Sequence, residues 1–231
     1  MINNIIVKEI KKKAPSTQLL LSKIKIKFDI KKIQIYLSSS KPEIIYQGIK
    51  IPITEISVYL KLSSIVKSKT EINQVIVSLV NFKIEDVQKL AIRTKPSNLK
   101  TYLLNNLNKG KIKKISIDVK LDKNLNITDY KVSGSVKKIN LKIYNNLLIQ
   151  DVNLNFISDT DLTLINSIKA NYQGISISNG SISIKKKKEI EGKFNSQFNL
   201  KEEEKNKFLS NFNLDFLEKN KISGQGNLLH K

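Results

Sequence analysis

Apolar and polar side chains alternate with a period of two along much of the chain. In the segment KIKIKFDI, residues 23–30, isoleucine or phenylalanine takes every second position and lysine or aspartate takes the positions between. Successive side chains of an extended strand point to opposite faces, so this spacing gathers the apolar side chains on one face and the charged ones on the other. The pattern predicts a strand with one buried face and one face in water.

The same alternation recurs and predicts strands through most of the chain. Before residue 95 it occupies the stretches 33–37, 49–53, 56–62 and 75–79, and after Gly110 the stretches 115–121, 132–143, 152–156, 168–184, 194–200, 212–216 and 222–228. The later runs end in Asn, Asp, Ser or Gly, and turn residues spaced by about ten indicate a meander of antiparallel strands. The sharpest hairpin signal is Ser178-Asn179-Gly180, because Asn-Gly readily adopts the positive φ angles of a two-residue turn.

Helix is scarce. The best candidate runs from Ser97 to Asn108, where Pro96 and Ser97 give a start signal, leucines share one face and Gly110 can end the helix. A second short helix is predicted over Glu202–Leu209, and the segment 85–90 fits a short turn. The chain therefore divides into a first set of strands over residues 1–95, a helix over 96–110 and a β-meander over 111–231, all within one β-rich region.

Few side chains are available for catalytic or metal chemistry. The absence of cysteine excludes disulfides, thiolate nucleophiles and cysteine-based metal sites, and the only histidine, His230, has no second imidazole to complete a metal site or proton relay. Asp159 and Asp161 in ISDTDLTL could hold a divalent cation, although a polar turn before a strand is the more ordinary interpretation. We expect no enzymatic activity, no catalytic residue, no metal and no cofactor.

The net charge of +21 is carried by lysine, with Arg93 as the single arginine. Arginine supplies the planar fork that grips phosphates and guanine edges, whereas lysine often simply solvates a surface. The run Lys185–Lys188 could touch an anionic headgroup or nucleic acid, but it also fits a solvated hairpin end. Nucleic-acid binding is therefore only a third hypothesis, and we expect no nucleic-acid partner.

Something must cover the apolar face of so many strands. Sheets of more than about ten strands usually curl or split. The apolar face is then buried either within a closed sandwich or barrel, or in a trough that an apolar ligand fills. The lining residues are mostly aliphatic and tryptophan is absent, which favours an elongated, curved antiparallel sheet with one or two short helices. A closed β-sandwich acting as a scaffold module is the alternative.

The chain resembles the AsmA-like superfamily of TamB/YhdP-type proteins from the Gram-negative envelope. The resemblance covers Ser22 to Leu200 and rests on the alternating entry SKIKIKFDIKKIQIYL, the helix, and the run GKIKKISIDVKLDKNLNITDYKVSGSVKKINLKIY. It implies a taco-like β-groove that shields phospholipid acyl chains between inner and outer membranes. It also implies phospholipid or another acyl lipid as ligand, a membrane at one or both ends, and a periplasmic location. Such proteins carry an N-terminal membrane anchor, so we expect this chain to be a piece of a longer protein that is anchored in the inner membrane through a segment outside this chain.

The candidate ligand-binding residues are the apolar positions of the meander. Their expected role is to line a lipid groove, and the alternative that they form a closed core stays open. The candidates are Ile115, Ile117, Val119, Ile139, Leu141, Ile143, Val152, Leu154 and Phe156.

Overall fold

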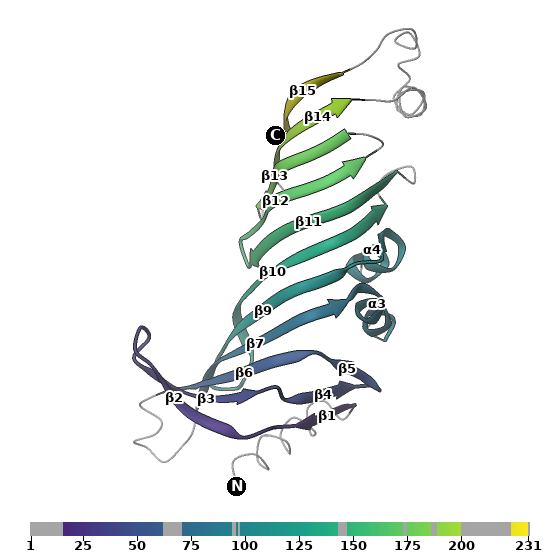
Figure 1. Cartoon of the computed structure of the whole chain (residues 1–231). Coiled ribbons are helices and arrows are strands. Elements are labelled where there is room, and N and C mark those ends of the chain that lie inside the picture. Colours follow the sequence, from purple (N-terminus) through teal and green to yellow (C-terminus); the bar gives the residue numbers. More distant parts are fainter. Residues whose placement is uncertain are drawn as a thin grey trace. The chain divides into compact units, whose positions relative to one another are not determined.

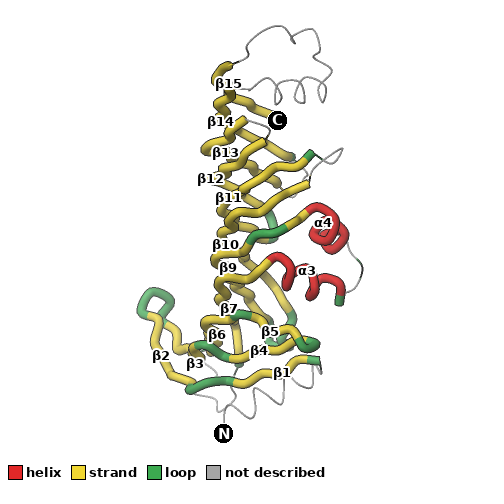
Figure 2. The backbone as a smooth tube through the Cα atoms, turned by 45° about the vertical axis from the view of Figure 1, so that its right-hand side comes forward, coloured by secondary structure: helices red, strands yellow, loops and turns green. Residues whose placement is uncertain are grey.

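The computed structural model confirms the predicted fold class. It describes residues 16–61, 71–93, 96, 98–142, 147–172, 175–185, 189–199 and 223–230. The chain is mainly β, its strands pair antiparallel in curved sheets that do not close on themselves, and the described residues contain two short helices (Figures 1 and 2). The second predicted helix, over Glu202–Leu209, lies outside the described residues.

Two compact units make up the chain. Unit 1 comprises Met1–Arg93 and Ile112–Gly134, and unit 2 comprises Thr94–Lys111 and Ser135–Lys231. The elements of unit 1 are β1 (Thr17–Leu20), β2 (Ile24–Asp29), β3 (Gln34–Ser40), β4 (Glu43–Tyr46), β5 (Ile49–Ile51), β6 (Ile53–Leu60), β7 (Ile72–Lys83), α3 (Ile84–Ile92) and nearly all of β9 (Lys111–Leu121). Those of unit 2 are α4 (Asn98–Asn106), β8 (Leu107–Asn108), β11 (Leu148–Asp159), β12 (Leu162–Tyr172), β13 (Ile175–Lys185), β14 (Ile190–Asn199) and β15 (Ser223–His230). The strand β10 (Ile127–Lys142) contributes residues to both units.

The strands form one small and one large sheet. The small sheet has the order β1-β4-β5. The large sheet has the order β15-β14-β13-β12-β11-β10-β9-β7-β6-β3-β2, with β8 paired beside β10. From β9 to β15 each strand of the main path lies next to the strand that follows it in the sequence, which is the meander that the turn spacing predicts.

The alternation of unit 1 places its two kinds of side chain on opposite faces of the sheet. The register aligns Leu37 of β3 with Val58 of β6, and Val58 with Val75 of β7, which gives one apolar row. The next row aligns Tyr36 with Tyr59, and Tyr59 with Gln74, on the other face. We call the side that bears Leu37, Val58 and Val75 the apolar face of unit 1.

The edge strand β2 departs from the expected burial. Ile26 pairs with Leu37, as the alternation predicts for the apolar face, yet its side chain is 72% exposed and that of Phe28 is 55% exposed. The reason is that, among the described strands, β2 is the last of the large sheet and has β3 as its one neighbour there. The prediction that this strand has one buried face was therefore wrong.

The helix α3 covers part of unit 1. Glu85 and Asp86 lie in its first turn and Lys89 in its last, an arrangement that favours the helix dipole at both ends. Ile84 and Ala91 are buried, and the helix contacts β7 and β5. The segment 85–90, which fitted a short turn, is thus part of a full helix.

The helix predicted over Ser97–Asn108 is present in shorter form. It runs as α4 over Asn98–Asn106, and the chain then continues directly into β8. There Leu107 pairs with Leu141 and Asn108 with Asn140 of β10.

Four strands of unit 2 each contain one residue in the left-handed region. These residues have φ angles of 52–53° and are Lys138 in β10, Asp151 in β11, Ser167 in β12 and Asn179 in β13. The strand register shifts at Asp151, Ser167 and Asn179, as a β-bulge requires. We call these four residues the bulge column.

Asn179 does not form the predicted hairpin. It lies in the middle of β13, where Ser178 pairs with Asn195 and Ser181 with Lys193, so the strand continues on both sides of Asn179. An Asn-Gly pair adopts positive φ equally well in a turn and in a bulge, and the neighbouring strand decides between them.

Each bulge is followed by a buried residue. Ile139 is 6% exposed, Val152 5% and Ile168 7%, and Gly180 is also buried. A bulge bends its strand and re-aims the side chain that follows. We call the side that bears Ile139, Val152, Ile168 and Gly180 the apolar face of unit 2.

Candidate functional site

The candidate residues of β9 lie on the apolar face of unit 1. Asp118 of β9 accepts a hydrogen bond from Nε2 of Gln74, so its side chain is on the polar face. Ile117 and Val119 flank Asp118 in the sequence and therefore point the other way, as does Ile115. All three apolar side chains are half-buried.

The candidate residues of β10 and β11 lie on the apolar face of unit 2. The backbone N–H of Lys138 donates to Oδ1 of Asn153 at 3.3 Å, and the backbone N–H of Asp151 donates to Oδ1 of Asn140 at 3.3 Å. These two reciprocal bonds place Ile139 beside Val152, with the asparagine side chains on the polar face. Both bulges are therefore braced by an asparagine of the neighbouring strand.

Beyond these bulges the apolar side chains are less covered. Leu141, Leu154 and Phe156 are half-buried. Phe156 pairs with Ile165 of β12, which lies on the same face. The remaining candidate, Ile143, is outside the described residues.

The structure adds residues that the sequence analysis did not select. Ile165 pairs with Ile182 and Ala170 with Ile177, so the apolar face of unit 2 extends over β12 and β13. Ile177 and Ile182 are half-buried. A signal for them exists in the sequence: the apolar spacing lengthens from two to three residues between Ile165 and Ile168, where the bulge falls.

Unit 2 also holds a shallow cavity whose lining is mainly polar. Its volume is about 360 Å³, and its lining comprises Asp151, Asn153, Lys169, Ala170, Asn171, Ser176, Ile177 and Ser178. Many of its polar groups are already engaged: Nδ2 of Asn153 donates to the carbonyl of Asp151 at 2.7 Å, and Oγ of Ser176 donates to Oδ1 of Asn171 at 2.9 Å.

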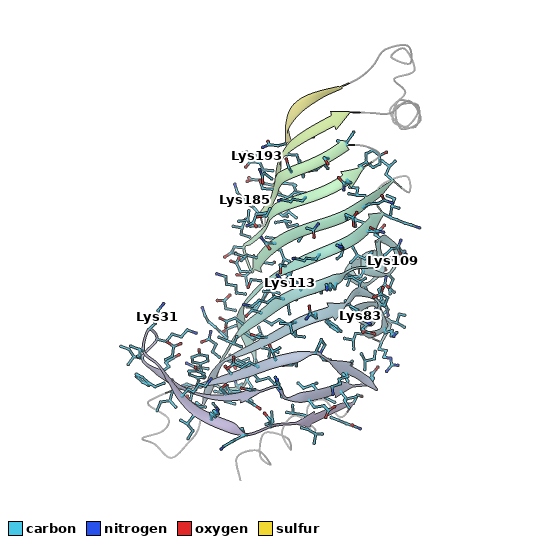
Figure 3. All side chains as sticks on the ribbon, viewed as in Figure 1. Lys31, Lys83, Lys109, Lys113, Lys185 and Lys193 are labelled. Carbon is cyan, nitrogen blue, oxygen red and sulfur yellow. The ribbon has the colours of Figure 1, made fainter. Side chains whose placement is uncertain are left out.

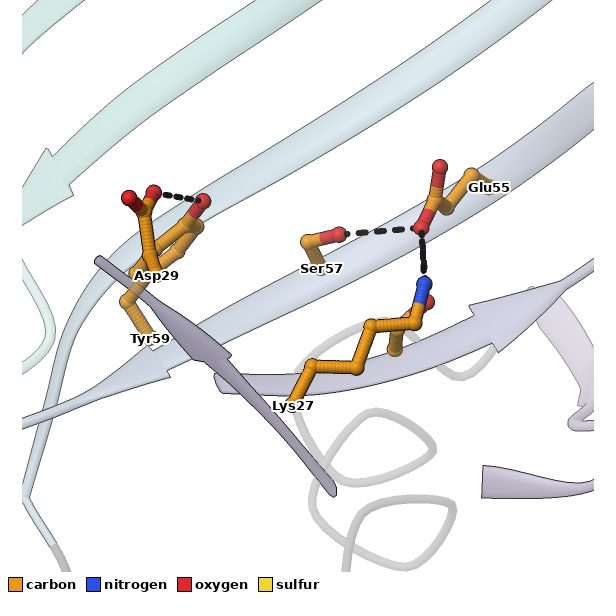
Figure 4. Close-up of polar contacts among 6 residues, drawn as sticks. Lys27, Asp29, Glu55, Ser57 and Tyr59 are labelled. Atoms are coloured by element: carbon orange, nitrogen blue, oxygen red, sulfur yellow. Dashed lines mark hydrogen bonds and ion pairs between the residues drawn. The ribbon is translucent and has the colours of Figure 1, made fainter. Parts of the chain in front are cut away.

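The polar face of unit 1 carries a hydrogen-bonded network (Figure 4). The hydroxyl of Tyr59 donates to Oδ2 of Asp29 at 3.1 Å, and the Tyr59 ring stacks on Tyr36 with 4.8 Å between ring centroids. Burial of the Tyr59 side chain and its bond to Asp29 raise the pKa of Tyr59 to about 12.

A second part of this network surrounds Glu55. Its Oε1 accepts from the hydroxyl of Ser38 at 2.6 Å and lies 3.5 Å from Nζ of Lys27. The Ser38 hydrogen bond, followed by the charge of Lys27, holds the pKa of Glu55 below its usual value. These contacts join β2, β3 and β6 and have the character of a structural network.

Asp159 closes the turn between β11 and β12. Its Oδ1 accepts from the backbone N–H of Asp161 at 3.0 Å and from that of Leu162 at 2.9 Å. Among the described residues, no three His, Cys, Asp or Glu side chains gather in a way that could hold a metal ion.

Comparisons of the chain with protein-family models, curated proteins and solved structures give no match. In the part of the chain that the structure describes, no helix is long and apolar enough to cross a membrane. The lipid-binding role expected from the AsmA-like resemblance therefore stands as a proposal, and the apolar faces of the two units are its candidate sites.

Proposed function

We propose that this chain binds lipid without catalysis and shields acyl chains on the apolar faces of its curved sheets. The observation that carries the proposal is the apolar face of unit 2. Its aliphatic side chains stay on one side of the sheet past all four residues of the bulge column, and most of them are only half-buried. A closed core would bury such side chains almost completely.

The burial pattern of β13 illustrates the point. Ile175, Ile177, Ile182 and Ile184 share one face, and all four remain half-buried in the structure. An apolar ligand would remove this surface from water. An acyl chain of roughly 16 carbons gains on the order of 10 kcal/mol on leaving water, so a partly open aliphatic face is a favourable environment for it.

The proposed setting is the cell envelope. There the chain would act as one segment of an AsmA-like bridge, with acyl tails held against the apolar face and headgroups kept in water. The exposed lysines on the opposite sides of the strands fit a wet outer surface. Net direction of lipid movement would require an energy source in another protein.

The test uses two neighbouring residues of β11 that point to opposite faces. Phe156 pairs with Ile165 on the apolar face, whereas Ile157 pairs with Leu164 on the other face and is 38% exposed. Purified wild-type chain should carry phospholipid that extraction and mass spectrometry detect. Phe156→Asp should lower the lipid-to-protein ratio, because a carboxylate on the lining repels the acyl chain. Ile157→Asp is the matched control and should leave the ratio unchanged.

Two results would contradict the proposal. One is reproducible absence of lipid from the folded wild-type chain, which would favour the closed scaffold module. The other is an equal loss of lipid in both variants, which would mean that lipid adheres without regard to the apolar face. Circular dichroism of each variant confirms that the comparison is between folded proteins.

A further inference from the structure

The hairpin between β2 and β3 presents large aliphatic side chains to water. Ile30 is 81% exposed and Ile33 66% exposed within its four-residue turn, next to the exposed Ile26 and Phe28 of β2. The hairpin projects from the sheet of unit 1, with Lys31 at its tip (Figures 1 and 3). Scattered apolar residues are common on surfaces, but four on one projecting hairpin form a patch that points to a partner.

The backbone of this turn is strained at one of its exposed apolar residues. Ile33 has a φ of 51°, a left-handed conformation in which a β-branched residue is a genuine outlier. Glycine or asparagine would fit that conformation with less strain. A strained residue that is also exposed contributes nothing to a core, so we infer that its side chain is kept for an external contact.

A second turn of unit 1 repeats the arrangement. Between β9 and β10, Leu125 has a φ of 63° and is 39% exposed, and the following Ile127 is 66% exposed. Asp122 closes this turn by accepting from the backbone N–H groups of Asn124 and Asn126, each at 2.8 Å.

The two turns lie at the same ends of the strands in unit 1. The chain enters β3 from the first turn and leaves β9 into the second, and antiparallel pairing through β6 and β7 puts these two strand ends on the same side. We call the turns 30–33 and 122–127 together the docking edge.

Lysines lie within both turns of the docking edge: Lys31 and Lys32 in the first, and the exposed Lys123 in the second. In the described part of the chain, no carboxylate forms an ion pair with the side-chain ammonium of Lys31 or Lys123. The one carboxylate of the hairpin, Asp29, is occupied by the backbone N–H groups of Lys31 and Lys32 and by the hydroxyl of Tyr59. The cationic charge beside the aliphatic tip is therefore available to an anionic partner.

We propose that the docking edge binds the surface of an anionic lipid bilayer. The aliphatic side chains of both turns enter the boundary between headgroups and acyl chains, while the lysines contact anionic headgroups. A bilayer fits better than a protein because the aliphatic side chains stand on two separate turns that each contain an exposed lysine, whereas a protein partner usually meets a flatter, continuous patch. This contact goes beyond the holding of single acyl chains on the apolar faces.

The test is co-sedimentation of the full chain with vesicles. Binding should be strong to vesicles of phosphatidylcholine mixed with phosphatidylglycerol and weak to vesicles of phosphatidylcholine alone, and salt should weaken it. The double variant Ile30→Ser/Ile33→Gly should lower the binding constant by roughly tenfold, and Leu125→Gly by less, because exposed apolar area is lost. Glycine at the two left-handed positions relieves strain, so these variants should fold at least as well as the parent.

The matched control is Ile92→Ser. Ile92 is 60% exposed at the end of α3, which follows β7 and so lies at the other ends of the strands. Its replacement should leave vesicle binding unchanged. The docking proposal is overturned if Ile30→Ser/Ile33→Gly binds as the wild type does, or if Ile92→Ser weakens binding equally. It is also overturned if light scattering shows that the double variant instead abolishes a dimer, since the edge would then join two copies.

Failure of this inference can be told apart from failure of the proposed function. Phe156→Asp, on the apolar face of unit 2, should bind anionic vesicles like the wild type. Loss of extracted lipid with retained vesicle binding separates the two sites. Retained extracted lipid in Ile30→Ser/Ile33→Gly separates them in the opposite direction.

Discussion

Gly180 of β13 and Phe194 of β14 lie so close together that a Cβ atom on Gly180 would be 2.6 Å from Cδ1 of Phe194. The same atom would be 3.0 Å from Cβ of Ile168 on β12. The side chains of the two neighbouring strands thus occupy the space above Gly180, and no room is left for a methyl group at this position. The packing of three strands depends on the absence of one side chain.

Replacing Gly180 with alanine should lower the free energy of unfolding by about 1–3 kcal/mol, because overpacking forces neighbouring side chains to shift. Urea denaturation measures the change. Trimming the ring in Phe194→Leu should recover part of the loss, so the double variant should be less unstable than the sum of the single changes. Strict additivity would show that the close approach is not the cause.

Lys138→Gly should raise the free energy of unfolding by up to about 1 kcal/mol, because a non-glycine residue in the left-handed region is strained. Lys138 has a φ of 52° in β10. Lys131 is an exposed lysine of the same strand with no positive φ, so Lys131→Gly should destabilise by a similar amount. Thermal denaturation compares the two, and a destabilising Lys138→Gly would contradict the left-handed conformation of Lys138.

Alkaline pH should destabilise unit 1 through Tyr59. The pKa of Tyr59 is raised to about 12 in the folded protein, so the folded state holds the phenol proton more tightly than the unfolded state. The resulting stability is fully present below the unfolded pKa of about 10 and is lost as the pH rises towards 12. Tyr59→Phe should lose less stability over this window than the wild type, measured by denaturation at a series of pH values. Identical slopes would count against the Tyr59–Asp29 bond.

Ser38→Ala should raise the pKa of Glu55 towards its ordinary value, because the shortest hydrogen bond to the carboxylate is removed. Carboxyl resonances followed by NMR over an acid titration measure it. Ser57→Ala is the matched control, since the Ser57 hydroxyl is 3.5 Å from Oε1 of Glu55 and should shift the pKa less. In the wild type, the contribution of Glu55 to stability is present above its unfolded pKa and is lost as the pH falls through the folded value.

The strand pattern was predictable because one face of each strand is apolar. The alternation over residues 23–30 gave β2 at Ile24–Asp29, and the candidates Ile117 and Val119 share the face expected for them. The degree of burial was not predictable from that alternation. Ile26 is mostly exposed because burial depends on how many strands lie beside its own strand. The alternation of apolar and polar residues does not reveal the order of strands in the sheet.

The bulge column was only partly predictable. The apolar spacing lengthens by one residue between Val136 and Ile139. This shows that the alternation shifts by one position there, but it does not show which backbone conformation produces the shift. Asn179-Gly180 was assigned to a hairpin because local preference for positive φ is the same in both structures. The register with the neighbouring strands β12 and β14 distinguishes them.

The succession of neighbours in unit 2 has a consequence for how the chain folds. From β10 onward each strand pairs with the one before it in the sequence, so no distant segment must arrive before a strand can form. Contacts between strands that are adjacent in the sequence lower the entropic barrier to adding each strand. They therefore favour growth of the sheet in the order in which the chain is synthesised. Among the described strands β15 is at the edge of the sheet, and edge strands open more readily than inner ones, so β15 and β14 should exchange their amide hydrogens before β11 does.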